Sequence, residues 1–147
     1  IAAAASALGT GDRLPTCAGH SLGTGVAAAM AAEGRCARLA LVAAYTSLPD
    51  VAAGLYPFLP AHLLMADRYD TLSRAPGLQG IPTLLIHGED DRTIPAELSV
   101  RLHTVLPGSE LRLREDRGHN DVLDEDTLDA IAEFVLGGAH ADGAPAP

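Results

Sequence analysis

LPTCAGHSLGTGVAAAMAAEG, residues 14–34, contains the pattern from which the fold of this chain can be predicted. It begins with a short, mostly apolar segment (14–20) of strand length, although Pro15 cannot donate to a β ladder. It continues as an alanine-rich segment (22–33) that ends at Gly34, a residue type typical of helix C-caps. The sequence therefore predicts a strand, a tight glycine-flanked turn and a helix.

Ser21 lies at the turn itself, within a G-x-S-x-G pattern made by Gly19, His20, Ser21, Leu22 and Gly23. A serine at a sharp strand-to-helix turn has a strained backbone and an exposed hydroxyl, and its glycine neighbours leave room for the turn. The backbone N–H of Leu22, at the start of the helix, would face negative charge that develops on a reacting carbonyl. We expect His20 to support the packing of this turn rather than to act as a base. The alternative is an ordinary glycine-rich turn before a helix.

The rest of the chain alternates between strand-like and helix-like segments. Continuous apolar runs at 38–44 and 81–87 are typical of strands that are buried on both faces of a parallel sheet. Residues 110–114 alternate between polar and apolar, which predicts a strand nearer a sheet edge. Apolar residues at helical spacing predict helices over 95–105 and 121–136. This order predicts an α/β fold with a mostly parallel sheet and flanking helices.

The domain boundaries follow from the same pass along the chain. We expect one partial domain over residues 1–136, in which residues 1–8 are the end of a surface helix and the chain begins inside a longer protein. Four prolines break the segment 45–80 into short pieces, with helical stretches near 49–54 and 60–66, and we interpret it as a short lid-like excursion. Residues 137–147 lack a core-forming pattern and predict a disordered tail.

Two polar residues stand where a serine nucleophile would need its partners. A serine hydroxyl requires a base, and in strand–turn–helix hydrolases the order along the chain is serine, acid, histidine. Asp91 follows the strand at 81–87, and His119 follows the strand at 110–114. The carboxyl ends of parallel strands meet at one edge of a sheet, so we expect these side chains to lie near Ser21.

The segments GHSLGTGVA, IPTLLIHGEDDRTIP and GHND together resemble the α/β-hydrolase superfamily, and within it the BEM46-like group related to the eukaryotic ABHD hydrolases. The resemblance runs from about Leu14 to Val135 and implies the C-terminal portion of that fold, with the early strands missing. It implies that Ser21 is the nucleophile and His119 the base. It also implies that Asp91, three residues after the His-Gly pair, is the acid rather than Asp90.

The resemblance implies a serine hydrolase that cleaves a carboxylic ester, a thioester or a lipid acyl bond without a metal or an organic cofactor. It implies a small-molecule or lipid acyl substrate. A second oxyanion donor would come from one of the missing loops. Tyr45, Tyr56 and Phe58 are candidates to line the pocket over Ser21, although they could equally fill a core poor in aromatic residues.

Two other functions stay open on the sequence alone. A peptidase of the prolyl-oligopeptidase type has a related domain, but its turn usually carries a further glycine where this chain has Thr24. The second alternative is an inactive fragment of the parent hydrolase, because half of a parallel sheet exposes an apolar strand edge and lacks one oxyanion donor.

The composition of the chain bears on its binding partners and on its cellular compartment. The net charge of −9 makes nucleic acid an unlikely partner, since an acidic surface repels phosphate backbones. No apolar run is long enough to cross a bilayer, and the default location is cytoplasmic. Cys17 and Cys36 have no metal-ligand spacing, and we expect two buried free thiols in a reducing compartment.

Overall fold

The computed structural model describes residues 14–56, 58 and 69–141. In chain order, the described elements are β1 (Thr16–His20), α2 (Gly23–Ala32), β2 (Arg38–Val42), α3 (Leu48–Leu55), α5 (Thr71–Leu78), β3 (Thr83–Gly88), α6 (Glu97–Val105), β4 (Glu110–Arg114) and α7 (Glu125–Ala141). The predicted alternation of strands and helices is therefore confirmed, whereas the expected helix end at residues 1–8 lies outside the described residues.

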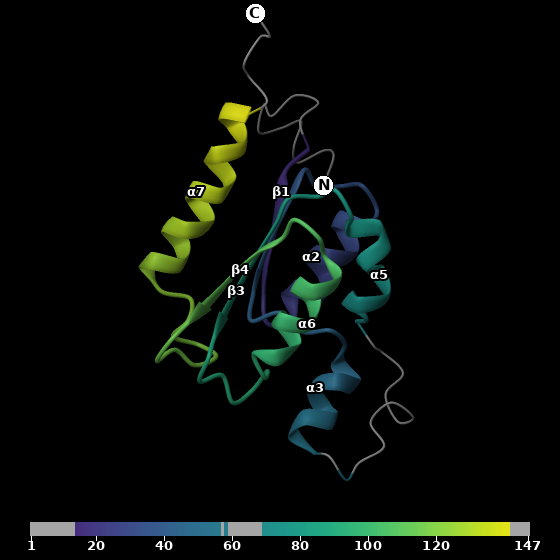
Figure 1. Ribbon diagram of the computed structural model, residues 1–147, viewed down its shortest axis with the longest axis vertical. Coiled ribbons are helices and arrows are strands. Elements are labelled where there is room, and N and C mark those ends of the chain that lie inside the picture. Colours follow the sequence, from purple (N-terminus) through teal and green to yellow (C-terminus); the bar gives the residue numbers. More distant parts are fainter. Residues whose placement is uncertain (1–13, 57, 59–68, 142–147) are drawn as a thin grey trace, which may run out of the picture.

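The four strands form one parallel sheet in the order β1-β2-β3-β4. In Figure 1, α7 covers one face of this sheet, while α2, α5 and α6 cover the other. As predicted, β2 and β3 are almost wholly buried, and β4 lies at an edge with a half-exposed pattern. Since the strands are parallel, the loops after β1, β3 and β4 all emerge at the same edge of the sheet.

Each face of the sheet packs against its own helical layer. Leu39, Leu41 and Leu85 pack in one cluster with the alanines of α2 and with residues of α5 and α6. Their strand neighbours Val42 and Ile86 belong to a second cluster that includes Ala130 of α7. Alternate residues of a strand point to opposite faces, so these apolar runs fill two cores at once.

Helix α5 was not predicted, and it changes the interpretation of segment 45–80. The Asp70 side chain caps the helix by accepting from the Ser73 N–H at 2.8 Å. Ala75 and Leu78 pack into the α2 cluster, and this packing holds the helix despite Pro76 inside it. Residues 71–78 are thus part of the helical layer rather than of a lid. Helix α3 confirms the stretch near 49–54, and the predicted stretch near 60–66 lies outside the described residues.

The last helix differs from its predicted bounds at both ends. It starts at Glu125 rather than at residue 121, because the Asp124 carboxylate accepts from the Thr127 N–H at 2.9 Å and caps the first turn. It then continues to Ala141, so residues 137–141 are helical and the prediction of a disordered tail was wrong for them. Within the part of the chain that the structure describes, α7 included, no helix has both the length and the apolar character to span a membrane.

The two cysteines are joined in a disulfide, so the prediction of free thiols was wrong. Cys17 lies in β1, and Cys36 lies where the chain returns from α2 toward the neighbouring strand. The Ala37 N–H donates to the Pro15 carbonyl at 2.9 Å, and this return brings the two Cα atoms to 5.6 Å. The expectation of a reducing compartment depended on free thiols and loses that basis.

Reduction of this disulfide is expected to destabilise the chain by about 3 kcal/mol, because the bond closes a loop across a sequence separation of 19. Urea unfolding with and without dithiothreitol measures the difference. The double variant Cys17→Ser/Cys36→Ser is the control, and its unfolding midpoint should not respond to the reductant. An unfolding midpoint of the unaltered chain that reductant leaves in place would contradict the prediction.

Candidate active site

Ser21 occupies a strained turn between the end of β1 and the start of α2. Its φ is +54°, a left-handed conformation that residues other than glycine seldom adopt. The turn is held by a hydrogen bond from the Ser21 N–H to the Val42 carbonyl at 3.0 Å. The Ser21 carbonyl accepts from the Thr24 N–H at 2.9 Å and from the Thr24 hydroxyl at 2.7 Å. Strain of this kind persists where the surrounding structure imposes it, and it is common at functional sites.

The two glycines of the G-x-S-x-G pattern have different roles. A Cβ at Gly19 would overlap the backbone carbonyl of Gly23, so only glycine fits there. A Cβ at Gly23 would meet nothing within 4 Å, so the expected steric need for glycine was wrong at this position. What the turn requires of Gly23 is the path of its backbone, against which Gly19 packs.

The variant Gly19→Ala is therefore expected to lose about 1–3 kcal/mol of stability through overpacking. The matched variant Gly23→Ala should be as stable as the unaltered chain or gain up to about 1 kcal/mol, since alanine is the better helix former. Chemical unfolding of both variants measures the contrast. Equal stabilities of the two alanine variants would refute this account of the turn.

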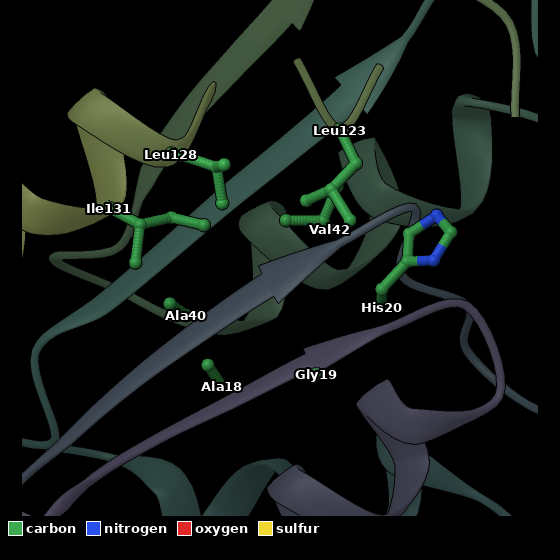
Figure 2. A pocket seen from close by; sticks show the side chains of 8 residues that line it. All are labelled: Ala18, Gly19, His20, Ala40, Val42, Leu123, Leu128 and Ile131. Atoms are coloured by element: carbon green, nitrogen blue, oxygen red, sulfur yellow. The ribbon is translucent and has the colours of Figure 1, made fainter. Parts of the chain in front are cut away.

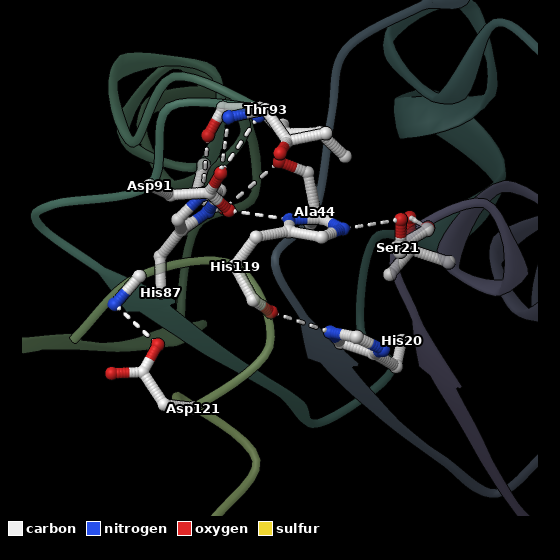
Figure 3. A network of polar contacts seen from close by, with 12 residues as sticks. His20, Ser21, Ala44, His87, Asp91, Thr93, His119 and Asp121 are labelled. Atoms are coloured by element: carbon white, nitrogen blue, oxygen red, sulfur yellow. Dashed lines mark hydrogen bonds and ion pairs between the residues drawn. The ribbon is translucent and has the colours of Figure 1, made fainter.

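His119 joins Ser21 to Asp91 through its imidazole ring (Figure 3). Its Nε2 lies 2.9 Å from the Ser21 Oγ, and its Nδ1 lies 2.7 Å from the Asp91 Oδ2. An ionised carboxylate only accepts hydrogen bonds, so the ring proton sits on Nδ1 and Nε2 is left to accept from the serine hydroxyl. The structure thus brings together the three residues that the sequence singled out, from loops that follow β1, β3 and β4.

The Asp91 carboxylate is buried, and both of its oxygens accept hydrogen bonds. One oxygen, Oδ1, accepts from the Thr93 and Ile94 N–H groups at 2.8 Å each, and Oδ2 faces His119. Burial opposes ionisation, but the hydrogen bonds from Ile94, His119 and Thr93 outweigh it and hold the pKa of Asp91 below its ordinary value. The adjacent Asp90 is exposed, in keeping with the choice of Asp91.

His87 is a second histidine beside the same carboxylate. It is wholly buried, and its Nε2 lies 2.9 Å from the Ile94 carbonyl and 3.3 Å from the Asp91 Oδ2. Its Nδ1 lies 2.6 Å from the Ser99 Oγ of α6. Burial lowers the pKa of His87, which favours its neutral form. The strand predicted over 81–87 ends at this residue, but the sequence carried no signal for its contact with Asp91.

Gly88 is a residue of the site that the sequence analysis missed. A Cβ here would overlap the Arg117 carbonyl, so the loop that carries His119 packs directly on the end of β3. The Asp90 N–H also donates to the Arg117 carbonyl at 2.9 Å. The glycine after His87 was the available signal, since glycine at a strand end often marks a close backbone approach.

Tyr45 was a candidate either for the pocket or for the core, and the structure places it in the core. It is 0% exposed, and its hydroxyl donates to the Leu22 carbonyl at 3.2 Å, beneath the start of α2. Burial raises the pKa of Tyr45 to about 12. A Cβ at Gly25 would come within 2.5 Å of the Tyr45 hydroxyl, so helix and ring are closely packed. Tyr45 therefore supports the turn from below instead of lining an open pocket.

Tyr56 and Phe58 are exposed and pack edge to face, with ring centroids 6.5 Å apart. Neither lines the apolar pocket of about 270 Å³ that lies between the sheet and α7 (Figure 2). The residues of that pocket are Ala18, Gly19, His20, Ala40, Val42, Leu123, Leu128 and Ile131. The pocket thus reaches the serine turn at His20, from the face opposite α2.

Among the described side chains, no cluster of three or more His, Cys, Asp or Glu residues is arranged to hold a metal ion.

Sequence comparison finds relatives that are longer than this chain. An uncharacterised protein of Mycobacterium tuberculosis is 37% identical over 129 residues, which cover 80% of this chain and 43% of that protein. An uncharacterised hydrolase of Bacillus subtilis, YugF, is 41% identical over 54 residues, which are 37% of this chain and 19% of that protein. This chain therefore spans less than half the length of these relatives. No model of a known protein family matches it.

Solved structures with the same fold include proteins named as α/β-hydrolases, a puromycin hydrolase and an esterase domain. A puromycin hydrolase superposes with a TM-score of 0.73 at 22% identity, over 98% of this chain and 24% of that one. An α/β-hydrolase from a deep-sea metagenome gives a TM-score of 0.66 at 16% identity, over 99% and 70% of the two chains. An esterase domain from Rhodothermus marinus gives 0.60 at 21% identity, over 95% and 65%. The chain has part of the α/β-hydrolase fold, with a parallel four-stranded sheet and flanking helices.

Proposed function

We propose that this chain carries the catalytic groups of a serine hydrolase that forms an acyl-enzyme on Ser21. The observation that carries the proposal is the hydrogen-bonded series Ser21–His119–Asp91, with contacts of 2.9 Å and 2.7 Å. Its starting point is a serine in a strained turn at a helix start, where an attacking hydroxyl is accessible. In this series Ser21 is the proposed nucleophile, His119 the base and Asp91 the acid that orients the histidine.

In the proposed mechanism, His119 Nε2 takes the proton of Ser21 as the Oγ attacks the substrate carbonyl carbon. Asp91 keeps the other ring proton on Nδ1 and stabilises the imidazolium that forms. The tetrahedral intermediate then collapses, and His119 donates its proton to the leaving alcohol, thiol or amine. A water molecule, deprotonated by the same histidine, attacks the acyl-enzyme and releases the acid. These steps use no metal and no organic cofactor.

The Leu22 backbone supplies one donor to the oxyanion in this proposal. Its N–H stands at the beginning of α2, where the first amides of a helix have no partner within the helix. A second donor would come from the part of the longer relatives that this chain does not span. Loss of one donor typically costs about a hundredfold to a thousandfold in rate. If the chain is instead an inactive fragment, the acylation rate of Ser21 should be lowered by more than about a thousandfold.

The proposed substrate is a carboxylic ester, a thioester or a lipid acyl compound, and we place the chain in the BEM46-like group on its GHSLG and GHND segments. A structural neighbour named as an esterase domain supports an ester substrate. The alternative is a peptidase of the prolyl-oligopeptidase type, and neighbours named as a puromycin hydrolase and a puromycin-hydrolysing peptidase support that choice. At the position after Gly23, the wholly buried Thr24 bonds to the Ser21 carbonyl, which favours the first choice.

Paired substrates test the proposal. We expect p-nitrophenyl acyl esters to be hydrolysed faster than the p-nitroanilide of an amino acid, and a fluorophosphonate to label the chain at Ser21. Faster cleavage of the anilide would move the assignment to a peptidase. A folded chain that neither hydrolyses an ester nor reacts with the fluorophosphonate would overturn the proposal for this chain.

A further inference from the structure

We propose that His20 is a positioning residue that holds the main chain of His119 in register with Ser21. This inference rests on the proposed function, since it assigns a role within the same site. His20 precedes the serine directly and is the first of the two variable residues of the G-x-S-x-G pattern. The sequence predicted that it packs the turn, whereas its hydrogen bond leads across the site to another loop.

The contact joins two segments that are far apart in sequence. The His20 Nε2 lies 3.1 Å from the His119 carbonyl oxygen, across 99 residues of sequence (Figure 3). The two rings lie 5.2 Å apart between centroids and are tilted by 34°. The C-terminal end of β1 thus places a donor from His20 on the His119 backbone, and the following residue presents the serine Oγ to the His119 ring.

The direction of this hydrogen bond is set by chemistry. A carbonyl oxygen only accepts, so His20 must carry a proton on Nε2. The side chain is half-buried, in a position where it borders the apolar pocket beside α7 on its other side. A phenyl ring could fill the same space, but it could not make this bond. A substitution can therefore remove the Nε2–H donor of His20 and leave the packing of the ring in place.

The His119 loop also has hydrogen bonds that do not involve the serine turn. The Arg117 carbonyl accepts from Asp90, and the Gly118 N–H donates to the Asp121 carboxylate at 2.8 Å. The bond from Asp90 ties the loop to the segment after β3, and the bond from Gly118 to Asp121 closes the loop on itself around His119. The bond from His20 joins the loop to the serine turn. Without it, the His119 ring would keep Asp91 but lose its fixed approach to Ser21.

A loss of alignment of this kind acts on the reacting geometry rather than on substrate binding. A displacement of about 1 Å in a reacting group costs about a hundredfold in rate. We therefore expect His20→Phe to slow fluorophosphonate labelling of Ser21 by about tenfold to a hundredfold. For ester hydrolysis, kcat should fall while KM stays within about twofold, because an alignment held only for the chemical step does not contribute to binding.

Three variants separate the donor from the shape of the side chain. His20→Phe keeps a ring and removes the donor, whereas His20→Gln places an amide N–H near the position of Nε2. His103→Gln is the control, since His103 is a half-buried histidine with one side-chain bond, to Ser109 at 2.8 Å, on α6. We expect His20→Gln to recover most of the labelling rate, and His103→Gln to label like the unaltered chain. If His20→Phe does not fold, His20→Asn takes its place, because the amide of asparagine is one methylene shorter than that of glutamine and ends short of the position of Nε2.

The proton NMR signal of the His119 Nδ1–H gives a readout that does not need turnover. We expect this signal to broaden in His20→Phe through faster exchange with water and to sharpen again in His20→Gln. An unchanged signal and labelling rate in His20→Phe would overturn the inference, and so would equal impairment of the Phe and Gln variants. If the unaltered chain is not labelled at all but the signal still follows the donor, the positioning role stands and the proposed hydrolase function fails.

Discussion

Replacement of Ser21 by alanine is expected to lower ester hydrolysis by about 10⁴-fold to 10⁶-fold and to abolish fluorophosphonate labelling, because alanine has no hydroxyl to form the acyl bond. The Ser21 Oγ is the atom that faces His119 Nε2 at 2.9 Å. The folded state should persist, since alanine removes a single oxygen from a half-buried side chain. Stopped-flow or long-time ester assays measure the residual rate.

Ser73→Ala is a suitable control for this experiment. Ser73 is an exposed serine of α5, and its hydroxyl bonds only within its own helix start, to the Asp70 carbonyl at 3.0 Å. Its variant should be labelled and should hydrolyse esters like the unaltered chain. Labelling that persists in Ser21→Ala would exclude Ser21 as the nucleophile and would direct the search to another residue.

Asp91→Asn is expected to lower kcat by about 10⁴-fold at neutral pH. The asparagine can turn its N–H₂ group toward His119, which would move the ring proton from Nδ1 to Nε2 and leave no acceptor for the Ser21 hydroxyl. The matched variant is Asp90→Asn, which removes one exposed carboxylate from the neighbouring position. Its kcat should stay within about twofold of the unaltered chain.

The same pair of variants differs in the pH dependence of stability. The pKa of Asp91 is lower in the folded chain than its ordinary value of 3.8, so the folded state favours the ionised form. The stabilisation is therefore complete above that ordinary pKa and is lost as the pH falls through the lower pKa of the folded state. Urea unfolding from pH 6 downward should show this loss in Asp90→Asn and a weaker loss in Asp91→Asn. Similar activities of the two variants at neutral pH would contradict the choice of Asp91 as the acid.

Local patterns were enough to predict the framework of the fold. The apolar runs of β2 and β3 match strands with two buried faces, and a strained turn at Ser21 follows from glycines between a strand and a helix. The loops that carry Asp91 and His119 were predicted to meet at one sheet edge, because parallel strands end on the same side. Such predictions depend on residues that are close in sequence or on rules of connection that hold for all parallel sheets.

Contacts between distant segments were not predictable in this way. Pro76 argues against a helix over α5, but the helix forms because its apolar residues pack against α2. The pairing of Cys17 with Cys36 depends on how closely the chain returns beside β1. No pattern of spacing encodes such a distance, since it results from the packing of the whole α2 layer.

Local patterns in the sequence were enough to predict the alternation of strands and helices apart from α5, the serine turn, and three polar residues that follow strands. Only the tertiary structure decided which neighbours those residues have: His20 on the His119 carbonyl, His87 beside Asp91, and Tyr45 beneath Leu22. The physical reason is the range of the interactions. Periodicity and turn preference act over a few residues, whereas a hydrogen bond across 99 residues exists only once the sheet has brought its strand ends together.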